Sequence, residues 1–165
     1  MFNPVASQAV NFERVQSNKE LRKMIKLESG LDVRRMDNFS LIAILAVFRL
    51  MKDQQIEQRI GLYSVATYFS IDLLQGLLMD INNNVDIRPV DFISTVGNTA
   101  NFYLAKLFNI TGPNIFIGTS EKAQEKLLSL AQCDLNNGLI DYALLVEWQD
   151  NEISYQCVAK LLQRT

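Results

Sequence analysis

The chain has 165 residues, of which 48% are apolar and 21% are charged, and its formal net charge is −2. This length and composition predict one soluble domain over residues 1–165, and the near-neutral charge excludes the basic surface that binds nucleic acid or an anionic membrane. The longest apolar run, 41–48, is too short to cross a bilayer, and no secretory signal is present, so we expect a cytoplasmic protein.

Helical and extended patterns alternate along the first half of the chain. In chain order we expect a strand near 4–12, a helix over 18–27, a helix from 38 to about 52, a strand over 60–66, a helix from 70 to about 81 and a loop at 82–84. Gly30 is expected to end the first helix, and Asp37 or Asn38 to cap the second.

The second of these helices has apolar residues nearly all the way round. Within 41–51 only Arg49 interrupts the apolar surface. A helix that is apolar on every side is buried on every side or covered by a partner. We therefore expect this helix to lie in the core.

The second half of the chain continues the alternation and closes with a hairpin. We expect an irregular or extended segment at 89–96, a helix over 98–109, a strand at 115–117, a helix over 120–136, a strand over 141–148, a turn at 149–151 and a strand over 153–162. The triplet Thr111-Gly112-Pro113 is a clear stop signal for the helix before it. The order of elements predicts one α/β domain.

Four segments carry a resemblance to a known family. They are Arg34 to Leu41, Ile60 to Leu62, Pro89 to Pro113 and Leu135 to Val146. The third segment contains Pro-x-x-Phe, Val-x-Asn and Gly-Pro in order, and resembles the part of β-ketoacyl synthases that leads into the nucleophile strand. The resemblance covers about residues 33–162. It implies an α/β fold that is a single half of a thiolase-like fold, with a mixed sheet flanked by helices.

The residue at the family's nucleophile position is not a cysteine here. Counting from Gly112, the tenth position is Glu121, and the chain contains no histidine. Histidine-dependent nucleophile pairs and most zinc sites are thereby excluded. We expect no catalytic residue, no cofactor and no metal, and we interpret Glu121 as a residue in the first turn of a helix. The alternative is an acyl-processing enzyme of altered mechanism that uses Glu121 in place of the cysteine.

Other candidate residues are better explained by structure than by chemistry. Thr119 and Ser120 lack a base and are expected to cap a helix. The expected loop residues Asp80, Asp86 and Asp91 match no metal-binding spacing. Four aromatic residues could line an acyl tunnel, although packing is the simpler explanation: Phe102, Tyr103, Phe108 and Phe116. Cys133 and Cys157 are expected to be buried free thiols.

The helix expected over 120–136 has two separable faces. One is polar, with Glu121, Lys122, Glu125, Lys126, Ser129 and Gln132. The other is apolar, with Ala123, Leu127, Leu128, Leu130, Ala131 and Leu135. In a complete ketosynthase this helix lies between two sheets, so a polar face is what a stand-alone half would need. We expect a genuine single-half protein.

The resemblance also implies an interface. Ketosynthases pair through the strand after Gly-Pro, which here corresponds to Asn114, Ile115, Phe116, Ile117 and Thr119. We expect a homodimer, or a heterodimer with a ketosynthase, in fatty-acid, polyketide or aryl-polyene biosynthesis. Acyl carrier protein is a weaker candidate partner, because Arg34, Arg35 and Lys106 form only a thin basic patch for an acidic protein.

Overall fold

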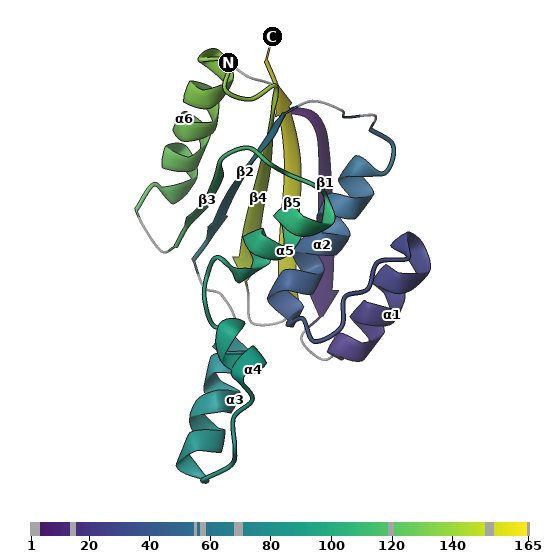
Figure 1. Ribbon diagram of the computed structural model, residues 1–165, viewed down its shortest axis with the longest axis vertical. Coiled ribbons are helices and arrows are strands. Elements are labelled where there is room, and N and C mark those ends of the chain that lie inside the picture. Colours follow the sequence, from purple (N-terminus) through teal and green to yellow (C-terminus); the bar gives the residue numbers. More distant parts are fainter. Residues whose placement is uncertain are drawn as a thin grey trace.

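A five-stranded mixed β-sheet forms the centre of the molecule in the computed structural model (Figure 1). The structure describes residues 4–13, 16–54, 56, 59–67, 71–118, 121–150 and 154–164. The strands are β1 (Pro4–Glu13), β2 (Ile60–Ala66), β3 (Asn114–Ile117), β4 (Tyr142–Asp150) and β5 (Ser154–Gln163). They lie in the order β1-β5-β4-β2-β3, which leaves β1 and β3 at the two edges. Strand β2 runs parallel to β3 and β4, whereas β5 is antiparallel to β1 and β4.

The described residues form six helices, which surround or extend this sheet. They are α1 (Asn18–Ser29), α2 (Asn38–Met51), α3 (Ile71–Asn82), α4 (Pro89–Ile93), α5 (Thr99–Leu107) and α6 (Ala123–Asn136). Helices α1, α2 and α5 lie on one face of the sheet, and α6 packs against the other face over β2 and β4 (Figure 1). Within the described residues, no helix has both the length and the apolar character that crossing a membrane requires.

Helix α2 is the centre of the main core, as its sequence predicts. The Asp37 side chain accepts a hydrogen bond from the Ser40 backbone N–H at 3.2 Å and so caps the helix. From Ser40 to Val47 every residue is buried, with contacts to the sheet on one side and to α1 and α5 on the others. Burial on all sides matches the all-round apolar pattern.

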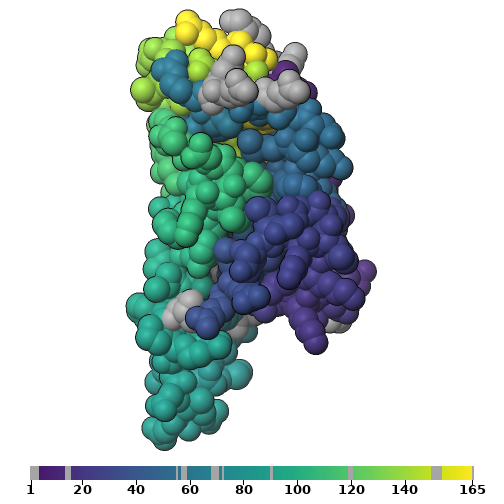
Figure 2. All heavy atoms as spheres, turned by 45° about the vertical axis from the view of Figure 1, so that its right-hand side comes forward, coloured from purple at the N-terminus to yellow at the C-terminus, as the bar shows by residue number. Residues whose placement is uncertain are grey.

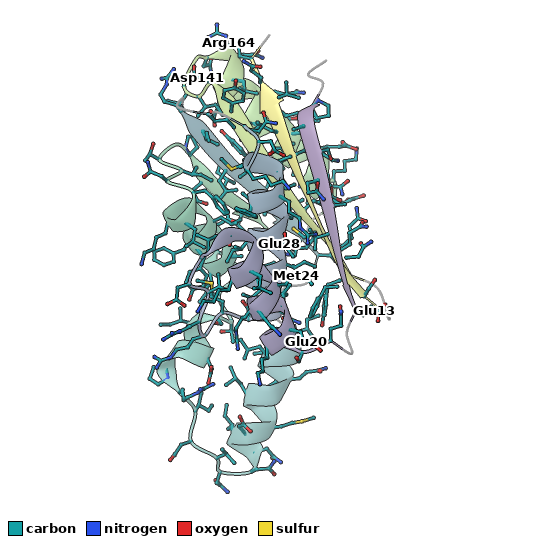
Figure 3. The ribbon with its side chains drawn as sticks, turned by 90° about the vertical axis from the view of Figure 1, so that its right-hand side faces the viewer. Glu13, Glu20, Met24, Glu28, Asp141 and Arg164 are labelled. Atoms are coloured by element: carbon teal, nitrogen blue, oxygen red, sulfur yellow. The ribbon has the colours of Figure 1, made fainter. Side chains whose placement is uncertain are left out.

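Helix α1 packs against α2 and contributes Leu21 and Ile25 to the main core. Its N-terminus carries a capping box, in which Ser17 and Glu20 bond to each other's backbone N–H, and Gly30 ends it with a φ of 72°. An ion pair between Glu28 and Arg49, with Oε1 and Nη2 2.6 Å apart, ties α1 to α2. Figure 3 labels Glu28 beside Met24 on α1. The hydrogen bond from Arg49 lowers the pKa of Glu28.

Helix α6 covers part of the second face. Its buried residues are Leu127, Ala131 and Leu135, which pack on the sheet. A further link is the hydrogen bond of 2.5 Å that the Tyr63 hydroxyl donates to an Asp134 carboxylate oxygen. Burial of the ring, with this bond as a second cause, raises the pKa of Tyr63.

Helices α3 and α4 form an arm that projects beyond the end of the sheet. We call residues 71–97 the arm; Figure 2 shows it standing clear of the rest of the molecule, in teal. Helix α3 packs against α4, and Leu77 is the one apolar residue of α3 classed as buried among those described. The chain reverses between the helices through a turn at Asn83 and Asn84, where the Val85 N–H donates to the Asp80 carbonyl at 2.8 Å.

Most of the predicted elements are confirmed, and several details are wrong. The segment 89–96 is not extended, because α4 begins at Pro89, where a missing N–H costs nothing. The expected turn residues Gln149 and Asp150 continue β4. Cys157 is buried but Cys133 is exposed. On α6, Leu128 and Leu130 were assigned to the covered face, yet both are exposed.

Candidate functional site

The edge strand β3 is the structural centre of the predicted interface. It pairs in parallel with β2, with Leu62 opposite Asn114 and Val65 opposite Ile117. On its other side it has no neighbouring strand among the described residues. The edge of a sheet presents backbone groups on which another chain can add a strand. The sequence placed an apolar strand here, and the topology makes it an edge.

A buried polar network fixes β3 from within. Asn101 of α5 is fully buried; its side-chain oxygen accepts from the Ser64 hydroxyl at 2.5 Å, and its amide nitrogen donates to the Asn114 side chain at 2.8 Å. The same nitrogen lies 3.3 Å from the carbonyl oxygen of Ile115. Buried polar groups of this kind specify one arrangement because any shift leaves them unsatisfied. Sequence reasoning missed Asn101, although an asparagine within an apolar helix was the available signal.

Alternate residues of β3 face opposite sides of the sheet. The ring of Phe116 packs edge-on against Trp148, with centroids 6.5 Å apart, and Trp148 stacks on Phe39 at 4.2 Å. Ile115 and Ile117 pack instead with the residues under α6. Each predicted interface side chain of these three therefore has contacts within this chain. A partner at this edge would be held mainly through the backbone. The predicted fifth interface residue, Thr119, lies outside the described residues.

Glu121 lies in a turn before α6, not in its first turn as expected. The helix begins at Ala123, and Glu125 is the acidic residue of the first turn. Between them Lys122 adopts a left-handed conformation with φ 59°. The Glu121 side chain is exposed. Thr119 and Ser120, which were expected to cap this helix, lie outside the described residues, and Lys122 occupies the N-cap position.

The remaining candidates do not form a chemical site. Asp91 binds Arg88 through two hydrogen bonds of 2.7 and 3.0 Å, and the described residues contain no cluster of three metal-ligating side chains. Burial raises the pKa of the Cys157 thiol and so suppresses its thiolate. Of the aromatic residues proposed for a tunnel, Tyr103, Phe108 and Phe116 pack against the main core, whereas Phe102 is exposed.

Cavities lie beside these elements, and two of them have volumes of about 400 Å³ or more. One, of about 400 Å³, is a mainly apolar groove between α6 and the face of β4 and β5. The other, of about 440 Å³, lies at the root of the arm and is lined by Arg22, Arg35 and Arg88 together with Asp37 and Asp91. The structure thus groups Arg35 with two arginines that the sequence did not single out.

Comparison with solved structures identifies the fold. The ishigamide ketosynthase/chain length factor matches with a TM-score of 0.73 and 15% identity, over 86% of this chain and 48% of that chain. The ketosynthase ApeO in complex with its chain length factor ApeC from Xenorhabdus doucetiae matches with a TM-score of 0.68 and 16% identity, over 99% of this chain and 79% of that chain. A third match is the complex of a type II PKS acyl-carrier protein with its ketosynthase bound to the hexaketide. Its TM-score is 0.62 and its identity 14%, over 98% of this chain and 63% of that chain.

These similarities confirm the predicted fold class. This chain has the α/β architecture of a thiolase-like, ketosynthase-type half, with a mixed sheet flanked by helices. It spans about half the length of the ishigamide ketosynthase/chain length factor chain that it matches. No protein-family model and no curated protein matches the sequence.

Proposed function

We propose that this chain, which has the fold of a ketosynthase half, is a non-catalytic accessory subunit that pairs through β3 with a ketosynthase. The setting would be cytoplasmic biosynthesis of a fatty acid, polyketide or aryl polyene. The observation that carries the proposal is a ketosynthase-type fold with Glu121 where the family resemblance calls for the nucleophilic cysteine.

A carboxylate is a poor substitute for the thiol in holding an acyl group taken from a thioester. A cysteine thiolate attacks a thioester and forms a new thioester of similar energy, so the acyl group can reside on the protein. A carboxylate attacking the same thioester would form a mixed anhydride, which is a more reactive acyl donor than the thioester it came from. The equilibrium would therefore leave the acyl group on its carrier. This chain also supplies no imidazole to assist decarboxylation, because it contains no histidine.

The geometry of β3 supports the pairing part of the proposal. The strand is short, lies at the sheet edge and is held in register by Asn101. A second β3, from a like-folded partner or another copy, could add to this edge about a two-fold axis. Solved structures with the same fold include a ketosynthase bound to its chain length factor, which favours the heterodimer over the homodimer.

The proposal is tested with the ketosynthase encoded nearest to this chain in its genome. The two proteins are mixed, and hydrogen exchange is followed by mass spectrometry with and without the ketosynthase. We expect a 1:1 complex in which the amides of 114–117 become protected. Acyl and malonyl carrier proteins are then added, and intact mass should show no acyl group on this chain.

Three results would contradict the proposal. Absence of any complex at micromolar concentration would remove the pairing role, and a wild-type homodimer protecting 114–117 would replace it by self-association. A stable acyl adduct on Glu121, Cys133 or Cys157 would contradict the non-catalytic role, and one on Glu121 would favour the altered-mechanism enzyme.

A further inference from the structure

The arm exposes more large apolar side chains than any other part of the described molecule. Nine are exposed: Ile71, Leu74, Leu78, Met79, Ile81, Val85, Phe92, Ile93 and Val96. Met79 and Phe92 are each 66% exposed, and Leu78 and Ile81 are each 57% exposed. Exposed apolar side chains gathered in this number on a projecting element mark an interaction site, because leaving them in water is unfavourable.

The arm is nevertheless a formed structure. Helix α3 is followed by a hydrogen-bonded turn, with the Asn83 N–H donating to the Met79 carbonyl at 3.0 Å and Asn84 in a left-handed conformation of φ 55°. At the other side of the turn the Arg88 guanidinium bonds Asp91 in a fork across the start of α4. The apolar side chains are therefore presented on regular helices, and Figure 3 shows the ribbon of these helices extending beyond the body.

The charged residues of the arm indicate which kind of partner surface would fit it. The arm contains four aspartates and one arginine, and Arg88 is paired with Asp91. Asp86 is exposed near the tip, and Asp80 is half-buried beside it. Two arms packed against each other would bring like charges together, which disfavours a second copy as the occupant. An acidic carrier protein is disfavoured for the same reason. The complementary surface is an apolar groove with lysines or arginines on its rim.

The arm lies next to the β3 edge, so we expect the protein that pairs with β3 to offer that groove. Strands β2 and β3 are parallel and in register, so Val65 and Ile117 lie together at one end of the edge. The chain leaves β2 at this end and enters the arm. A partner added to β3 therefore lies beside the root of the arm, and the arm extends past the end of the same sheet (Figures 1 and 2).

We propose that the α3–α4 arm clasps the ketosynthase partner, placing its apolar face in a groove with a basic rim. This inference rests on the proposed function, because it names the second contact of the same complex. The edge strand supplies register through the backbone, and the arm supplies apolar burial and selection by charge.

The test compares affinities for the ketosynthase used above. The arm variant is Leu78→Gln with Met79→Gln, which keeps helix propensity while removing apolar surface. The matched control is Leu27→Gln with Leu139→Gln, two residues exposed elsewhere on the chain. We expect the arm variant to raise Kd by at least about tenfold and the control to leave it within about twofold. A charge variant, Asp80→Lys with Asp86→Lys, should also weaken binding, and the loss should shrink as salt is added.

Each outcome decides between the two proposals. If both arm variants bind like wild type while 114–117 is still protected, the arm has no role and the pairing through β3 stands. If wild type forms no complex, the proposed function and the arm contact both fail. Circular dichroism and melting temperature confirm that every variant is folded, and arm amides protected in the wild-type complex provide a readout that needs no substitution.

Discussion

Helices α2 and α3 are both rich in apolar residues and have opposite surroundings. The segment Leu41 to Val47 of α2 is apolar throughout, and the segment Ile71 to Ile81 of α3 is interrupted only by Asp72, Gln75, Gly76 and Asp80. Every residue of that α2 segment is buried, whereas in α3 Leu77 alone is classed as buried among the described side chains. The pattern predicts that a helix needs covering, and it does not say whether the cover comes from the same chain.

The difference in burial between α2 and α3 is tested most directly by placing a charge in each helix. Ile44→Asp puts a carboxylate among fully buried side chains of α2, and we expect a loss of about 4 kcal/mol or more in the free energy of unfolding. Leu78→Asp in α3 should change it by less than about 0.5 kcal/mol, because the side chain is exposed. Urea denaturation of the two variants measures both values. Equal losses would mean that α3 is part of the core.

A second pair of variants compares a buried polar residue with an exposed one near α5. Asn101→Leu removes the partner of Ser64 and Asn114 and should cost about 1–3 kcal/mol through unsatisfied polar groups. The control is Asn98→Leu, since Asn98 is exposed and its side chain makes no capping hydrogen bond. Thermal unfolding compares the two. Faster hydrogen exchange in 114–117 of Asn101→Leu would link the loss to β3, and unchanged exchange would argue against that link.

The smallest effect concerns the packing of α1 on α2. The folded pKa of Glu28 is lowered, so the stabilisation by its bond to Arg49 is present above the unfolded pKa of about 4.3 and is lost as pH falls through the folded value. Both side chains are about one-third exposed, so we expect no more than about 0.5 kcal/mol. Unfolding of wild type and Glu28→Gln should differ at pH 7 and converge near pH 3. A difference that persists at pH 3 would assign the effect to packing.

The sequence predicted the regular parts of this fold because their signals are local. Asp37 as a cap, Gly30 as a stop and the apolar pattern of α2 each depend on neighbouring residues. The family resemblance added the topology, and the solved structures confirm it. Helix α4 was missed, although proline suits the first position of a helix and Pro89 stands there.

The candidate site was less predictable. The strand Asn114 to Ile117 was found from its apolar residues, but the role of Asn101 depends on α5 lying against β3, which is a tertiary contact. Likewise, the exposure of Leu128, Leu130 and the arm depends on which helix faces are covered. An apolar residue carries the same local signal whether its cover lies in its own chain or in a partner.

The pairing of β1 with β5 also constrains how the chain folds. Strand β1 has β5 as its neighbour in the sheet, with Val10 opposite Cys157, so its partner is synthesised almost a whole chain length later. Non-local pairing of this kind slows folding, because a long loop must close before the contact forms. Until β5 emerges, β1 and part of the surface beneath α2 lack their cover during translation. The pairing of β1 in the sheet is therefore complete only after the last described strand, β5, has been synthesised.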